Sequence, residues 1–184
     1  MGASTPMTAL RAWNADATRM PARMHAEYLR HFYLHNDLAE GRFRCGSEEP
    51  VDLSRLRVPL FAVATETDHV SPWKSVYRIH RLVGSEIDFV LTSGGHNVGI
   101  VSPPQGPASH PGASYRLARS APYQAPAQPE DWRTHAACFE GSWWPAWSEW
   151  LRRSSSGNVA SKPVHGLKFK GREVPAPGTY VFVQ

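Results

Sequence analysis

The sequence predicts an α/β fold built around a parallel sheet, because two apolar segments flank a stretch with helical spacing. Residues 58–64 and 87–92 are short and almost wholly apolar, as strands buried on both faces of a parallel sheet are. Strand, helix and strand together form a βαβ unit. Two such strands cannot bury themselves alone, so we expect the second half of an α/β domain whose first half is missing.

The composition is that of a soluble globular chain. It has 184 residues, of which 41% are hydrophobic and 20% charged, so disorder of the whole chain is excluded. The net charge of +4 is spread along the chain and no basic run is interleaved with aromatics, so no nucleic-acid partner is expected. The start has no signal-peptide pattern and no segment is apolar enough to span a membrane, so we expect a cytoplasmic protein without a transmembrane segment.

The first predicted element is a helix over residues 20–38. Met24, Tyr28 and Phe32 recur at the i, i+4 and i+8 positions, and Gly41 closes the stretch. After the first strand, residues 65–69 form a polar loop. A second helix then begins with Ser71 as N-cap and Pro72 at its first position, and ends before Gly84.

The remainder of the chain contains a proline-rich segment and one strong helical stripe. Residues 103–129 hold seven prolines and are expected to form an irregular surface excursion. A short helix is expected over 131–139. A further helix is predicted by a stripe that we interpret as packing on a core: Trp143, Trp147, Trp150 and Leu151.

Two polar residues follow the predicted strands in a pattern that indicates catalysis. Asp68 comes after the first strand and His96 after the second, 28 positions later. The carboxyl ends of parallel strands meet at one edge of a sheet, so we expect the two side chains to be neighbours. An acid followed by a histidine is the order of α/β-hydrolases, in which the carboxylate orients the imidazole and the imidazole activates a nucleophile. An Asp that caps a helix and a His bonded within a loop are the structural alternatives.

No nucleophile is expected within this chain. The Gly-x-Ser/Cys-x-Gly elbow that presents such a residue is absent. Cys45 lies in a polar connection before the first strand, and Cys138 follows His96, out of the expected order. No metal site is expected either, because His31 and His35 share a helix face but lack the glutamate of an HExxH motif.

Several separate segments, in the right order from Trp13 to the end, resemble the single-subunit polyhydroxyalkanoate synthases. The segments are Trp13-Asn-Ala-Asp16, Glu27-Tyr-Leu29, Tyr33-Leu-His-Asn36, Asp68-His69-Val-Ser-Pro-Trp73, Gly94-Gly-His96-Asn, Gly141-Ser-Trp-Trp144 and Pro177-Gly-Thr-Tyr180. The resemblance implies the C-terminal portion of an α/β-hydrolase fold, made of a cap helix, the two last parallel strands and flanking helices, with the nucleophile half absent. It also implies a cap segment over residues 1–41, catalytic-domain residues 42–156 and a tail over 157–184.

The resemblance further implies an acyltransferase that polymerises (R)-3-hydroxyacyl-CoA into polyester and releases CoA. Asp68 and His96 would belong to a Cys-Asp-His triad whose cysteine lies outside this chain, so the chain alone would be inactive. Two roles stay open for Asp68, which can orient His96 or activate the hydroxyl of the next monomer. Tyr33 and Asn36 would line the substrate channel, and His69 would lie close behind the catalytic pair.

The implied partners are the acyl-CoA substrate, the growing polyester, a second copy of the full-length enzyme and the surface of polymer granules. Trp13 would lie in a cap region that takes part in the dimer contact. No cofactor is expected, since acyl-CoA is the substrate. Two other functions stay open: an esterase or thioesterase of the same fold, and a non-catalytic remnant that binds a partner or a granule through exposed apolar surface.

Overall fold

The computed structural model describes residue 15 and residues 19–46, 49–106, 109–161, 166 and 168–174. The chain divides into two compact units, residues 30–158 and the two ends, 1–29 with 159–184. The larger unit contains the main sheet and both predicted catalytic residues. Trp13 lies outside the described residues.

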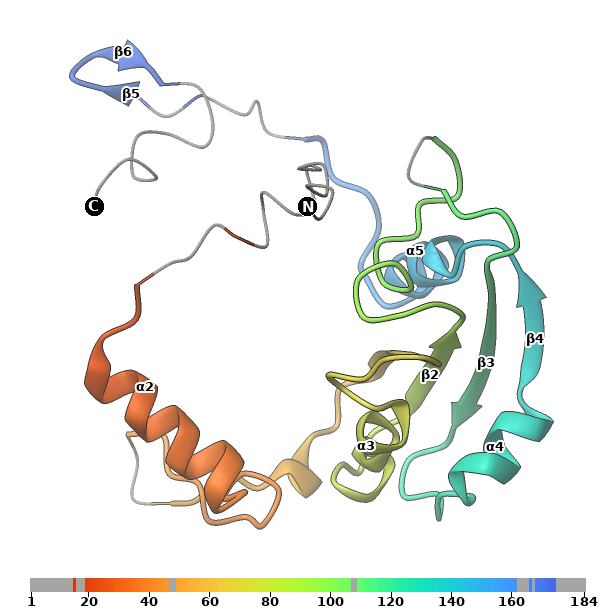
Figure 1. Ribbon diagram of the computed structural model, residues 1–184, viewed down its shortest axis with the longest axis horizontal. Helices are drawn as coiled ribbons and strands as arrows, with labels where there is room; N and C mark the ends of the chain where they lie inside the picture. The colour runs from red at the N-terminus through yellow and green to blue at the C-terminus, as the bar shows by residue number, and fades with distance from the viewer. Residues whose placement is uncertain are drawn as a thin grey trace, which may run out of the picture. The chain divides into compact units, whose positions relative to one another are not determined.

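A four-stranded mixed sheet forms the centre of the larger unit, in the order β1-β2-β3-β4. Figure 1 labels three of these strands, β2, β3 and β4, in that order. β1 (Leu60–Thr65) and β2 (Ile87–Thr92) are parallel, with a register from Leu60 opposite Ile87 to Thr65 opposite Thr92. β3 (Ser114–Ser120) and β4 (Ala137–Glu140) extend the sheet in antiparallel fashion. The predicted parallel pair is therefore confirmed, with the bounds of β2 as expected.

The prediction of an irregular excursion over 103–129 and a helix over 131–139 is wrong where the two antiparallel strands form. β3 lies within the proline-rich segment, but its own seven residues contain no proline and most are half-buried. The helix α4 (Pro129–His135) is shorter than expected and is followed after one residue by β4, whose four residues are all exposed. Neither strand has the continuous apolar run that indicates a buried strand, so the sequence pattern did not predict either of them.

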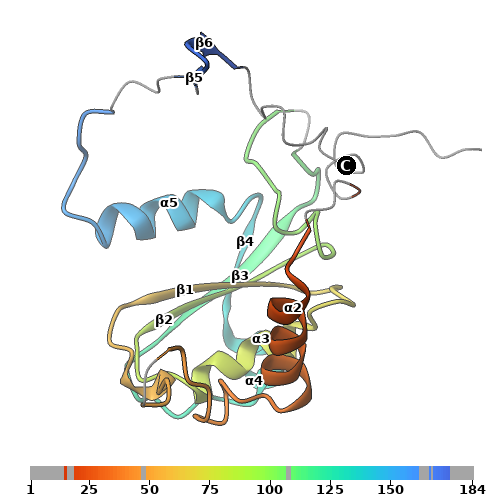
Figure 2. The ribbon, with the colours of Figure 1, turned by 90° about the vertical axis from the view of Figure 1, so that its left-hand side faces the viewer.

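Helices cover both faces of the sheet. α3 (Trp73–Tyr77), η3 (Arg78–Arg81) and α4 lie on one face, and α5 (Trp144–Arg153) lies on the other (Figure 2). Because side chains alternate along a strand, Phe89 of β2 packs on Tyr77 and Trp132, with ring centroids 5.2 and 5.0 Å away. Its neighbour Asp88 accepts hydrogen bonds from two arginines, one on β3 and one on α5.

The first helix ends earlier than predicted. It consists of α2 (Ala22–Tyr28) and the π-helical turn η1 (Leu29–Leu34), whereas the sequence predicted helix to residue 38. Asn36 has a φ of 51°, a left-handed conformation that stops a right-handed helix. The second helix starts later than predicted: α3 begins at Trp73, and Pro72 rather than Ser71 is its N-cap.

The end of the chain contributes a small two-stranded antiparallel sheet to the other unit, formed by β5 (Lys168–Phe169) and β6 (Arg172–Glu173). The division into segments 1–41, 42–156 and 157–184 stays a prediction. Among the described residues, no helix has both the length and the apolar character needed to cross a membrane.

The packing of Phe89 gives a test of the core. Phe89 is 0% exposed, so Phe89→Ala removes a full ring from the interior and is expected to lower the free energy of unfolding by about 3–5 kcal/mol. Phe139→Ala is the matched control, because Phe139 is 43% exposed and its loss is expected to cost about 1 kcal/mol or less. Urea unfolding of the two variants measures the difference, and equal losses would contradict this assignment of the core.

Candidate active site

The two predicted catalytic side chains meet at the carboxyl edge of the parallel strands. Nδ1 of His96 lies 2.8 Å from Oδ2 of Asp68. Asp68 stands three residues beyond the end of β1, and His96 stands four residues beyond the end of β2. The contact expected from the strand-end rule is therefore present.

Backbone hydrogen bonds hold the two loops together beyond the ends of the strands. The N–H of Glu66 donates to the carbonyl of Thr92 at 2.9 Å. Thr67 donates twice to the carbonyl of Gly94, from its N–H at 3.1 Å and from its hydroxyl at 2.7 Å. Gly94 has a φ of 97°, which a residue with a Cβ rarely adopts, so the loop can turn toward Thr67 at this point.

The carboxylate of Asp68 has hydrogen-bond donors on both oxygens. Oδ1 accepts from the N–H groups of Val70 and Ser71, each at 2.8 Å, and Oδ2 accepts from His96. The N–H of Ser71 is the largest cause that lowers the pKa of Asp68 to about 2; His96 and Val70 add to it and burial opposes it. The side chain is only 7% exposed, so a carboxylate that stays ionised is held in one orientation.

The same contact defines the proton positions on His96. An ionised carboxylate can only accept, so Nδ1 of His96 must donate and carry the proton. In the neutral imidazole, Nε2 is then the unprotonated nitrogen, which is the form a general base requires. The imidazole is exposed over 45% of its side-chain surface, in contrast to its partner. This pair can therefore take a proton from a group that approaches from the exposed side.

Three other residues were predicted at the site: His69, Tyr33 and Asn36. His69 directly follows Asp68 and is exposed. Tyr33 is exposed on η1, and Asn36 forms the left-handed turn after it. The roles of all three stay predictions.

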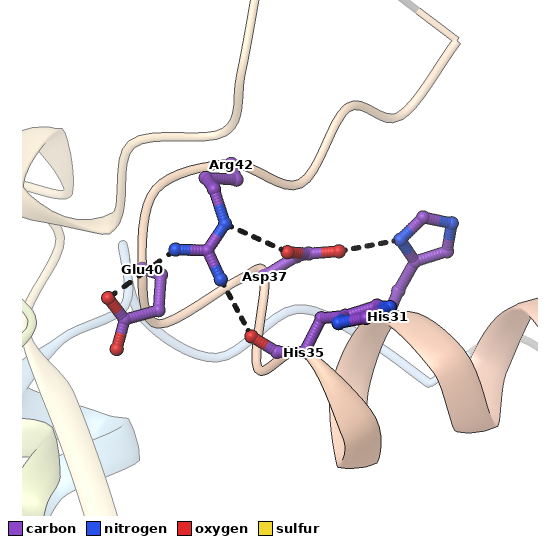
Figure 3. Close-up of polar contacts among 5 residues, drawn as sticks. All are labelled: His31, His35, Asp37, Glu40 and Arg42. Carbon is purple, nitrogen blue, oxygen red and sulfur yellow. Dashed lines mark hydrogen bonds and ion pairs between the residues drawn. The ribbon is translucent and has the colours of Figure 1, made fainter.

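Asp37 orders the turn that contains Asn36 (Figure 3). Its carboxylate accepts from Nδ1 of His31 at 2.8 Å and from Nε of Arg42 at 3.0 Å, and Arg42 also donates to the carbonyl of His35 at 2.7 Å. The hydrogen bond from His31 is the largest cause that holds the pKa of Asp37 below its usual value; burial opposes it, and the hydrogen bond from Arg42 adds to it. The turn is therefore fixed by contacts among residues 31–42.

The two cysteines are exposed free thiols: Cys45 lies before β1, and Cys138 lies in β4. In the part of the chain that the structure describes, no group of three or more His, Cys, Asp or Glu side chains is arranged to hold a metal ion.

Comparison with known proteins shows relatives along nearly the whole chain, although no family model matches it. It is 41% identical over 169 residues to a poly(3-hydroxyalkanoate) polymerase of Methylorubrum extorquens, which covers 92% of this chain and 26% of that protein. It is 36% identical over 186 residues to poly(3-hydroxyalkanoate) polymerase 2 of Ectopseudomonas oleovorans, covering 100% of this chain and 31% of that protein. The PhaC subunit of the Cupriavidus necator polymerase is 34% identical over 172 residues, or 92% of this chain and 27% of that subunit.

These comparisons confirm the resemblance to polyhydroxyalkanoate synthases. The chain spans between 26% and 31% of the length of the three polymerases. The relationship therefore concerns one region of those proteins.

The low pKa of Asp68 predicts a specific acid sensitivity. Its pKa is about 2 in the folded protein against an ordinary value of 3.8, so the unfolded chain takes up the proton first as the pH falls. The stability that Asp68 contributes is complete above its unfolded pKa and is lost as the pH falls from about 4 toward 2. Asp68→Asn has no carboxylate at this position, so its free energy of unfolding is expected to fall less steeply with decreasing pH than that of the unsubstituted chain.

Urea unfolding of both proteins at intervals between pH 5 and pH 2.5 measures this difference. Other carboxylates titrate in the same range in both proteins, so the comparison isolates Asp68. If the free energy of unfolding fell equally with pH in the two proteins, the carboxylate of Asp68 would not be held as described.

Proposed function

Because this chain is related over 92–100% of its length to poly(3-hydroxyalkanoate) polymerases, we propose that it forms the acid–base part of an acyltransferase that makes polyester from (R)-3-hydroxyacyl-CoA. The observation that carries the proposal is the 2.8 Å hydrogen bond between His96 and Asp68 at the carboxyl edge of β1 and β2. The mixed sheet with helices on both faces is then the C-terminal portion of an α/β-hydrolase fold.

In this proposal His96 is the general base and Asp68 orients it. Both oxygens of Asp68 already accept hydrogen bonds from the protein, and a carboxyl group with a pKa of about 2 is a weak base near neutral pH. These two properties disfavour direct activation of a monomer hydroxyl by Asp68. They suit a carboxylate that keeps the proton on Nδ1 and stabilises the imidazolium once Nε2 has taken a second proton.

The nucleophile is a cysteine thiol supplied from outside these 184 residues. Nε2 of His96 takes the thiol proton, the sulfur attacks the thioester carbonyl, and a new carbon–sulfur bond replaces the bond to CoA, which leaves with the proton. The hydroxyl of the next monomer then gives its proton to Nε2, and its oxygen attacks the enzyme-bound acyl group and releases the cysteine thiolate. Each cycle forms one ester bond and releases one CoA.

The remaining parts of the proposal concern the surroundings of the site. Tyr33 and Asn36 line the substrate channel, and His69 supports the pair from the position next to Asp68. The full-length enzyme works in the cytoplasm as a homodimer at the surface of polymer granules. Resemblance to the synthases supports these assignments.

The test joins this chain to the N-terminal part of the Methylorubrum extorquens polymerase and follows CoA release from (R)-3-hydroxybutyryl-CoA with a thiol reagent. Polyester is expected as the product. His96→Ala removes the base and is expected to lower the rate by about a thousandfold or more. Asp68→Asn is expected to lower it by roughly a hundredfold to ten-thousandfold, because the imidazole loses its orienting acceptor.

His135→Ala is the matched control. His135 is exposed on α4, and its Nδ1 donates to the carbonyl of Asp131 within the same helix, so its loss is expected to leave the rate unchanged. Free 3-hydroxy acid in place of polyester would identify a thioesterase. CoA release that survives His96→Ala, or an inactive joined protein that still binds granules, would contradict the proposed role of this chain.

A further inference from the structure

The loop that carries His96 continues as a helical turn. The N–H of Gly99 donates to the carbonyl of Gly95 at 2.9 Å, and the N–H of Val101 donates to the carbonyl of Asn97 at 2.8 Å. A short turn of this kind leaves its last carbonyls without donors from within the turn. Here these include the carbonyls of Gly99 and Ser102, whereas the carbonyl of Ile100 already accepts from the N–H of Ser102 at 3.1 Å.

Three consecutive side chains at the start of α5 donate to these carbonyls. Nε1 of Trp143 donates to Gly99 at 3.0 Å, and Nε1 of Trp144 donates to Ile100 at 3.0 Å. The hydroxyl of Ser142 donates to the carbonyl of Ser102. We call these three residues the indole clamp. They come from 40 to 44 positions further along the chain, so the clamp is a tertiary contact.

The indole clamp is itself firmly anchored. Trp143 is only 6% exposed, and its ring lies against Phe61 of β1 with centroids 6.2 Å apart. The oxygen of Ser142 also accepts from the N–H of Trp144 at 3.0 Å, and the N–H of Gly141 donates to the carbonyl of Ala113, just before β3. The donors are therefore fixed to the sheet on which Asp68 and His96 depend.

On its other side, the turn lies against the end of β1. A Cβ added to Gly99 would lie 2.6 Å from Cγ2 of Thr65 and 2.9 Å from the carbonyl of Ser93, which is closer than real contacts allow. Gly99 thus touches the last residue of β1 while its own carbonyl is held by Trp143. The turn is confined between the end of the sheet and the indole clamp.

We propose that Ser142, Trp143 and Trp144 are positioning residues that hold His96 against Asp68 by fixing the turn behind it. The proposal rests on the proposed function, since it gives these residues a role in the acid–base step. His96 is exposed, and Asp68 is the partner that the structure shows for its imidazole. The orientation of the imidazole therefore depends on its backbone, and the backbone depends on the clamp.

The test compares two substitutions of the same type in the 184-residue chain. The double variant Trp143→Phe/Trp144→Phe keeps aromatic rings at both positions and removes the two indole donors. Trp150→Phe is the matched control: Trp150 lies on the same helix and also packs on Phe61, at 5.7 Å, but its buried Nε1 has no hydrogen-bond partner among the described residues. The control thus changes packing without removing a hydrogen bond.

The readout is the Nδ1–H signal of His96 in the NMR spectrum of protein with ¹⁵N-labelled histidine, assigned by its loss in His96→Gln. Exchange of this proton with water is expected to become roughly tenfold faster or more in the double variant, since two hydrogen bonds to the turn are lost. It is expected to stay within about twofold in Trp150→Phe. If the double variant does not fold, Ser142→Ala and Trp144→Phe are measured separately, each with a smaller increase in exchange expected.

Unchanged exchange in folded clamp variants would overturn the proposal, and so would an equal increase in Trp150→Phe, because that would reflect helix packing alone. In the joined enzyme, the clamp variants are expected to lower kcat with little change in KM. Failure of the joined wild-type enzyme to release CoA would count against the proposed function and leave the NMR result standing, so the two failures are distinguishable.

Discussion

The parallel pairing of β1 with β2 is the constraint on which the candidate site depends. Six pairs in register end with Thr65 opposite Thr92, and both of these residues are buried. The pairing continues past the strands through Glu66 and Thr67, so the two loops leave the sheet already joined. A slip of one residue would turn the side chains of one strand to the other face and shift Asp68 relative to His96. The 2.8 Å contact between them is thus a consequence of register.

The two ends of helix α5 contact β2 and the loop that follows it. At its start, the indole clamp holds the turn that follows His96. At its end, Arg153 donates to Asp88, a buried carboxylate on β2 that also accepts from Arg119 of β3. β2 is the strand that leads into the His96 loop. One helix therefore contacts this segment both before and after His96, which limits how far the loop can move independently of the sheet.

The parts of the fold that could be predicted are those with a strong local signal. The apolar run 87–92 marked β2 correctly, and the strand-end rule then placed Asp68 beside His96. β3 and β4 could not be found in this way, since one is half-buried, the other exposed, and both owe their conformation to pairing with a neighbour. The stripe from Trp143 to Leu151 correctly indicated a helix. The acceptors of its indole groups could not be predicted, because backbone carbonyls 44 residues away carry no signal in the sequence.

The different exposure of the two site residues has a physical reason. Asp68 is almost enclosed and receives hydrogen bonds on both oxygens, so its charge and direction are set before any substrate arrives. In the proposed reaction His96 accepts a proton from an incoming group, so its outer nitrogen has to be reachable, and packing around the ring cannot hold it. A base of this kind is oriented by one hydrogen bond at its inner nitrogen and by the rigidity of its own backbone. The contacts of Asp68 provide the first, and the turn confined between Thr65 and the indole clamp provides the second.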